Sequence, residues 1–124
     1  MDICVDFDGT CVTHEYPLIG KDIGAVPVLK ALSQSGHNLI LFTMRSGYEL
    51  EQAVNWFKQH EIPLYGVNRN PSQDTWTSSP KAYAQLYIDD AAIGCPLIEQ
   101  EEGRPYVNWE QIRTLLCIDF KLDI

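Results

Sequence analysis

The chain has 124 residues and a formal net charge of −8 at pH 7. This length fits one domain spanning residues 1–124, and a hydrophobic content of 45% favours a packed core over a long disordered tract. The acidic excess excludes a general electrostatic attraction for nucleic acid or for an anionic membrane. No stretch approaches the ~20 apolar residues of a membrane span. We therefore expect a cytoplasmic protein whose four cysteines remain reduced.

The first half of the chain alternates apolar runs with amphipathic segments. The pattern predicts a strand at 3–7, a loop at 11–20, a helix from about Ala25 to Ser35, a strand at 38–43 and a helix from about Gly47 to His60. Gly36 suits the left-handed position that ends the first helix, and Ser46 can cap the second.

The second half is more polar, and its elements are shorter. The pattern predicts a strand at 64–67, a loop at 68–79, a short helix opened by Pro80, a strand at 85–89, a strand at 95–98 and a charged turn at 100–104. Asn108 and Gln111 resemble a capping box, which predicts a closing helix.

Strands that alternate with helices indicate an α/β fold. We expect a doubly wound, Rossmann-like parallel sheet with helices on both faces. Ligands of such sheets bind beyond the carboxyl ends of the strands, where the strand order switches. Polar residues stand at these ends: Asp6 and Asp8 after the first strand, Thr43 after the second, and Asp89 and Asp90 after the fourth.

Asp6 and Asp8 are separated by one residue, so an alternating strand would place both on one side, roughly 7 Å apart. One carboxylate could attack phosphorus while the other protonates the leaving oxygen. Gly9 permits a turn that brings backbone amides close to an anion. The alternative is that this segment is a solvated turn.

Asp89 and Asp90 are adjacent acids that repel each other unless a cation offsets their charge. Magnesium takes hard oxygen ligands and keeps several waters, so a few carboxylates suffice to hold it. Together with Asp6, the pair would form an acidic cup for one Mg²⁺. The alternative is that the pair caps a helix.

Three further side chains could bind phosphate. The Thr43 hydroxyl can donate a hydrogen bond, Lys81 at the start of the predicted short helix could reach the nucleophile and the phosphate, and Arg45 could add a second cation. Each has an ordinary alternative: a β-branched strand end for Thr43, and solvated surface charges for Lys81 and Arg45.

The order Asp6-Phe7-Asp8-Gly9-Thr10, Thr43, Lys81 and Asp89-Asp90 closely resembles the haloacid dehalogenase-like (HAD) superfamily over essentially the whole chain. The resemblance implies that Asp6 is a nucleophile that becomes an aspartyl-phosphate. It implies that Asp8 is the general acid/base, with its backbone carbonyl near the metal. Dehalogenases of the superfamily carry a lone Asp in the first motif, so the presence of Asp8 favours phosphoryl transfer.

The same resemblance assigns the remaining positions. Thr43 and Lys81 would bind the phosphoryl group, and Lys81 would also restrain Asp6. Asp90 would bind Mg²⁺ directly, with Asp89 helping directly or through water.

Many members of the superfamily carry an inserted cap domain. Here the stretches between Asp8 and Thr43 and between Thr43 and Lys81 are filled by the predicted elements, so we expect no cap and an open site. Relatives without caps often act on bulky substrates or close the site with a neighbouring subunit. We therefore expect a phosphorylated substrate of that kind, or a homo-oligomer that covers the site.

The leading interpretation is a magnesium-dependent phosphomonoesterase, and two alternatives stay open. One is a nucleotide or polynucleotide-end phosphatase, which an open site and Trp76 permit, although the acidic balance argues against tight strand binding. The other is a non-catalytic interaction module that retains the fold. Loop residues that could contact a leaving group are His14, Glu15, Tyr16, Asn68, Asn70 and Trp76.

Overall fold

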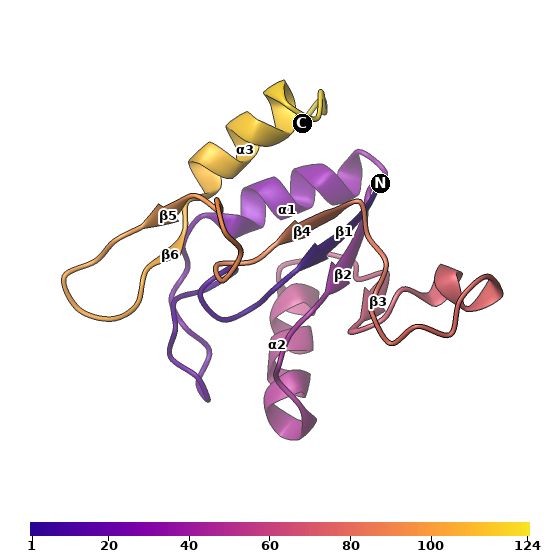
Figure 1. The fold of residues 1–124 in the computed structure, drawn as a ribbon. Helices are drawn as coiled ribbons and strands as arrows, with labels where there is room; N and C mark the ends of the chain where they lie inside the picture. Colours follow the sequence, from indigo (N-terminus) through magenta and orange to yellow (C-terminus); the bar gives the residue numbers. More distant parts are fainter.

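The computed structural model describes residues 1–124 and is built on a four-stranded parallel sheet (Figure 1). Its strands are β1 (Asp2–Val5), β2 (Asn38–Leu41), β3 (Gly66–Val67) and β4 (Leu86–Ile88), in the spatial order β3-β2-β1-β4. The chain runs outward from β1 to β3 and then returns to β4 on the other side of β1. The strand order therefore switches between β1 and β4, as the sequence predicts for the position of a site.

The remaining elements are α1 (Ala25–Gln34), α2 (Gly47–Gln59), a 3-10 helix η1 (Pro71–Thr75), a hairpin of β5 (Leu97–Ile98) with β6 (Tyr106–Val107), and α3 (Trp109–Ile118). All three predicted long helices are confirmed. The Asn108 side chain accepts a hydrogen bond from the Gln111 amide at 3.1 Å, as a helix cap requires. Ser46 occupies the cap position of α2 without a side-chain capping bond.

The expectation of helices on both faces of the sheet is wrong for the α-helices. Side chains of alternating strand residues, which point to one face, share a core with the buried residues of all three helices: Ile3, Val5, Leu39, Leu41 and Ile88 with Val28, Leu29, Leu32, Ala53, Trp56, Phe57, Trp109, Ile112 and Leu116. Because right-handed crossovers from β1 to β2 and from β2 to β3 run in one direction, they put α1 and α2 on the same side.

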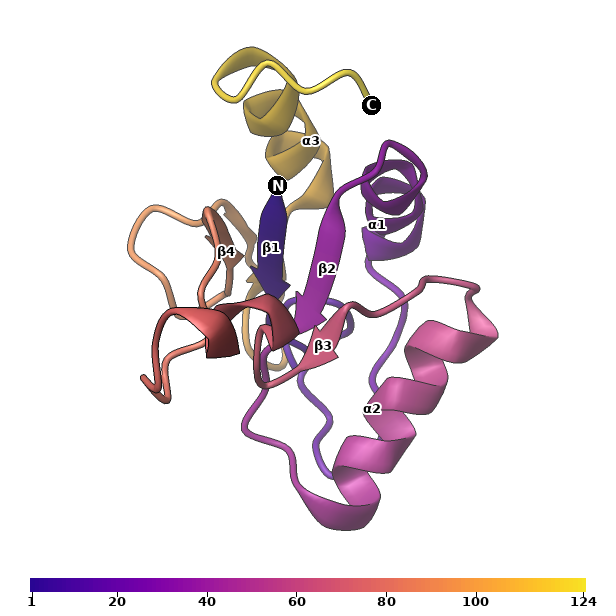
Figure 2. The same cartoon turned by 90° about the vertical axis from the view of Figure 1, so that its right-hand side faces the viewer.

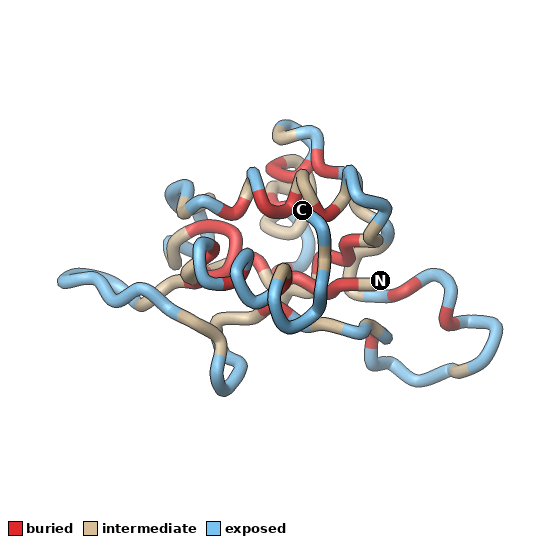
Figure 3. Tube along the Cα trace, turned by 90° about the horizontal axis from the view of Figure 1, so that it is seen from above, coloured by how far each residue is buried: buried red, intermediate tan, exposed pale blue.

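The opposite face of the sheet has a smaller cover. Cys4 and Ile40 pack there against Ala82, and the Phe42 and Tyr87 rings lie 6.2 Å apart. In Figure 2 the segment with η1 lies in front of the strands, on the side away from α1 and α2. Figure 3 shows that the hairpin and the η1 segment project from the buried centre as two mostly exposed arms.

Three local predictions differ from the structure. No helix follows Pro80; residues 77–85 form an irregular connection with bends, and its Ala82 and Ala84 contribute to the small cover of the second face. The strand predicted at 95–98 forms the separate hairpin and does not join the sheet. The sheet strands are also shorter than predicted, so Asp6, Thr43 and Asp89 lie in the turns that follow them.

No helix of the protein combines the length and the apolar character needed to cross a bilayer. All four cysteine thiols are free, and Cys4 and Cys11 are buried.

Candidate metal and phosphate site

The carboxyl ends of β1 and β4 bring three acidic side chains together. Asp6, Asp89 and Asp90 each offer an oxygen, and these oxygens all lie within 4.8 Å of one another. Neighbouring parallel strands end at the same edge of the sheet, which explains how residues so distant in sequence meet. The predicted acidic cup is therefore present.

Crowding of these carboxylates perturbs Asp6. Burial first, and then the negative charge of Asp89, raise the pKa of Asp6 to about 7 from its ordinary 3.8. Burial also disfavours the charged form of Asp90, but hydrogen bonding to His14 and the interaction with Asp6 outweigh it, so the pKa of Asp90 is lowered. Without a cation, Asp6 therefore keeps its proton to a higher pH than an ordinary aspartate.

Thr10 joins the two strands at this cluster. Its hydroxyl donates to Asp6 Oδ2 at 2.9 Å, and the Asp90 amide donates to the same hydroxyl oxygen at 3.1 Å. The Thr10 side chain is fully buried, and the indole Nε1 of Trp109 donates to its carbonyl at 2.6 Å. The first residue of α3 therefore helps to fix the loop that carries the acids.

His14 closes one side of the cluster. Its Nε2 lies 2.7 Å from Asp90 Oδ2. The ring packs against Gly9, where a Cβ atom would come within 2.0 Å of Nε2. Gly9 also has φ of +80°, which glycine adopts without strain. The position thus needs glycine for both its backbone conformation and its contact with His14.

Asp8 faces Arg45, away from the three clustered acids. Its two oxygens accept from the Arg45 guanidinium, at 2.8 Å from Nε and 2.7 Å from Nη2. The remaining guanidinium hydrogens go to the carbonyls of Pro17, Leu18 and Glu49. Arg45 is only 3% exposed and all its donors are used. The prediction that Arg45 binds phosphate is not supported by this arrangement, since its guanidinium instead positions Asp8.

Thr43 lies where the sequence predicts. Its amide donates to Asn68 Oδ1 at 2.8 Å, and its hydroxyl oxygen accepts from the Arg45 amide at 3.1 Å. The hydroxyl proton remains available for an anion in the cavity. Asn68, which the sequence suggested as a leaving-group contact, instead orients the chain after β2.

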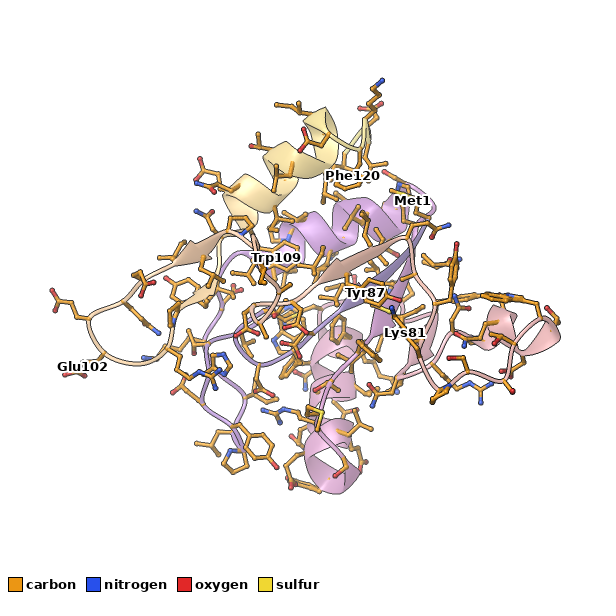
Figure 4. All side chains as sticks on the ribbon, in the orientation of Figure 1. Met1, Lys81, Tyr87, Glu102, Trp109 and Phe120 are labelled. Carbon is orange, nitrogen blue, oxygen red and sulfur yellow. The ribbon has the colours of Figure 1, made fainter.

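Lys81 does not reach the site. Its ammonium lies over the Tyr87 ring, 5.4 Å from the ring centre, on the face of the sheet opposite the helices (Figure 4). Residues 77–85 are irregular, with bends at Pro80 and Lys81, so the helix that was predicted to direct Lys81 toward Asp6 is absent. Trp76 is likewise remote and packs edge-on against Tyr83.

The predicted site residues other than Lys81 line one cavity of about 470 Å³. Its lining residues are Asp6, Asp8, His14, Tyr16, Thr43, Met44, Arg45, Asp89, Asp90, Ala91 and Arg104. Tyr16 and Met44 form an exposed apolar rim, with Met44 98% exposed. Arg104 comes from the hairpin and was predicted only as part of a charged turn. The sequence offers little indication of a role for Arg104, because it is a single cation in a turn otherwise rich in glutamate.

No protein-family model matches the chain, and no curated protein matches it. A solved structure of a conserved protein from Bacteroides thetaiotaomicron does: it is 38% identical, with a TM-score of 0.76 over 99% of this chain and 93% of that chain. The chain belongs to the same family as that protein. This similarity supports the α/β fold over 99% of the chain. The chemistry has to be argued from the residues of the site.

The clustered acids fit a hard divalent cation. They supply oxygen ligands only, and burial together with the nearby charge of Asp89 raises the pKa of Asp6, so a cation there would be favourable. Magnesium prefers such ligands. Asp6, Asp89 and Asp90 would hold it. The Asp8 carboxylate is outside the group because Arg45 binds both its oxygens, so only its backbone carbonyl is left for the metal contact that the HAD resemblance implies.

Proposed function

We propose that this protein is a magnesium-dependent phosphohydrolase of the HAD type without a cap domain, with Asp6 as the nucleophile. The observation that supports it most is the convergence of the Asp6, Asp89 and Asp90 oxygens within 4.8 Å, in the cavity that also holds Asp8 and Thr43. Such a cluster is unfavourable in the folded chain unless a cation compensates it.

In this proposal Asp6 attacks phosphorus and forms an aspartyl-phosphate, and the bond from phosphorus to the leaving oxygen breaks. Asp8 gives that oxygen a proton and then takes one from the water that hydrolyses the intermediate. To do so, one Asp8 oxygen must leave Arg45. Thr43 donates to a phosphoryl oxygen, and Thr10 holds Asp6 in place. A bound Mg²⁺ supplies compensation for negative charge on the phosphoryl group.

The apolar rim leaves room for a planar leaving group. Tyr16, which is 59% exposed, and Met44 both line the cavity. A nucleotide could rest its base there, which keeps the nucleotide phosphatase as a variant of the same chemistry. A panel of phosphomonoesters with and without nucleobases separates the two variants by their kcat/KM values.

A second candidate is a non-catalytic module that binds an anion and a metal without turnover. Two observations favour it: Lys81 does not line the cavity, and Asp8 is held by Arg45. Magnesium binding measured by calorimetry, together with no turnover on a wide substrate panel, would support this candidate.

The test is phosphate release from an aryl phosphate. We expect activity with Mg²⁺, loss of activity in EDTA, and loss in Asp6→Asn. Asp123→Asn is the matched control, because Asp123 is an exposed acid that does not line the cavity. Full activity in EDTA or in Asp6→Asn would contradict the proposal.

A further inference from the structure

The cavity has a shortage of positive charge for a phosphate dianion. Four acids line it: Asp6, Asp8, Asp89 and Asp90. Among the lining residues, Arg45 is the buried side chain with a permanent positive charge. With His14 neutral and all four acids ionised, Arg45 and one divalent cation still leave one negative charge uncompensated. Repulsion of this kind disfavours a dianionic phosphoryl group in a partly buried site. A further cation is therefore needed.

Of the nine Lys and Arg residues, only Arg45 and Arg104 line the cavity. Arg45 has no free donor, because its five N–H groups go to Asp8 and three backbone carbonyls. The ion pairs of the structure are His14–Asp90, Arg45–Asp8 and Arg69–Asp74. Arg104 belongs to none of them, and its guanidinium makes no hydrogen bond within the chain. It is the one cation at the cavity that is free to bind an anion.

The hairpin that carries Arg104 is anchored to the site. At its end, the Val107 amide donates to the Gly9 carbonyl at 2.9 Å, and Val107 is fully buried. Within the turn, Gln100 Nε2 donates to the Arg104 carbonyl at 2.7 Å. Figure 1 shows the hairpin and the segment between β1 and α1 on the same side of the molecule. The base of the arm is thus tied to the loop that presents Asp6.

We propose that Arg104 binds the phosphoryl oxygens of the substrate, in the place that the sequence assigned to Lys81. The inference rests on the proposed function, since it names the phosphate-binding cation of the same site. The planar guanidinium presents paired donors that match two phosphoryl oxygens. Gln100 is a positioning residue, because it fixes the turn from which Arg104 extends.

The test is calorimetric binding of inorganic phosphate to the Mg²⁺-saturated protein. We expect Arg104→Ala to raise the Kd about 10- to 100-fold, as for loss of a charged hydrogen-bond donor. Arg104→Lys should recover part of the affinity, and Gln100→Ala should weaken binding by a few-fold. Lys81→Ala and Arg113→Ala, which each remove one exposed cation away from the cavity, should stay within about twofold of the wild type.

Wild-type affinity in Arg104→Ala would overturn the inference, as would a loss confined to Lys81→Ala or a wild-type protein that does not bind phosphate. Turnover distinguishes this inference from the proposed function. Phosphate binding that depends on Arg104 in a protein without turnover supports Arg104 and contradicts the phosphatase. Turnover that depends on Asp6 but not on Arg104 does the reverse.

Discussion

Removing one charge from the acidic cluster should stabilise the metal-free protein. Burial and the charge of Asp89 raise the pKa of Asp6 to about 7. The folded chain therefore holds this proton more tightly than the unfolded chain. Its contribution to stability is fully present below pH 3.8 and is lost as pH rises through about 7. Asp6→Asn replaces the carboxylate by a neutral group of similar shape, whose oxygen can still accept from Thr10.

The size of the effect follows from the shift. About three pKa units at ~1.4 kcal/mol each correspond to roughly 4 kcal/mol. Relaxation and hydration of the half-buried group reduce this, so we expect Asp6→Asn to gain about 2 kcal/mol or more at pH 8. For a chain of this size that raises Tm by roughly 6 °C or more. At pH 5 the folded carboxyl keeps its proton and only the unfolded one is ionised, so less than half of this gain should remain and the difference in Tm should be smaller.

Thermal unfolding in EDTA, followed by circular dichroism at pH 5 and pH 8, measures this difference. Asp123→Asn removes an exposed charge and should leave Tm nearly unchanged at both values. The pKa of Asp90 is lowered, so its contribution to stability changes only below pH 3.8, outside this pH range. An Asp6→Asn protein that is no more stable than the wild type at pH 8 would refute the view that uncompensated charge strains the cluster.

Three further predictions follow from the same geometry. Magnesium affinity should fall about tenfold per pH unit below pH 7, because Mg²⁺ must displace the Asp6 proton. Calorimetry from pH 5.5 to 8 measures this affinity, and an affinity that does not change with pH would contradict the prediction. Gly9→Ala should destabilise the fold by about 2 kcal/mol or more and weaken Mg²⁺ binding, because the new Cβ at positive φ displaces the His14 ring; urea unfolding with and without Mg²⁺ shows both effects. Arg45→Lys should cost about 2 kcal/mol or more by denaturant unfolding, because lysine keeps the charge but cannot reproduce the paired bonds to the part-buried Asp8 carboxylate or the three carbonyl bonds. A cost below about 1 kcal/mol would argue against the positioning role.

The helices could be predicted because their signals are local. Each long helix has an apolar stripe that falls on one side, and Asn108 and Gly36 mark ends through hydrogen bonding and backbone conformation. Which face a helix covers is not local. A doubly wound sheet needs an α-helix between β3 and β4, and here only the short η1 and the irregular residues 77–85 connect these strands. Pro80 is compatible with both outcomes, so the sequence could not decide between them.

The acids of the site could be predicted because they end apolar strands, and parallel strands end at a common edge. The position of Lys81 was not predicted correctly, because that prediction depended on a helix after Pro80 that does not form. Arg45 was expected as a phosphate ligand, but the burial of its guanidinium among backbone carbonyls is a property of the packed loops. Such a tertiary arrangement has no pattern in the sequence.

The two sides of the cavity differ in how firmly they are held, and this bears on where substrate selection arises. On the side of Asp6, the buried bond from Trp109 to the Thr10 carbonyl and the bond from the Val107 amide to Gly9 tie the loop to the start of α3. Two distant parts of the chain thus fix Asp6 in place, as the proposed phosphoryl transfer would require. The Tyr16 and Met44 side chains of the rim are exposed, and the Tyr16 ring packs against the Arg45 guanidinium, 5.2 Å from the ring centre. Changes on the rim should therefore alter which leaving group is accepted, whereas changes at the β6–α3 junction should impair every substrate alike.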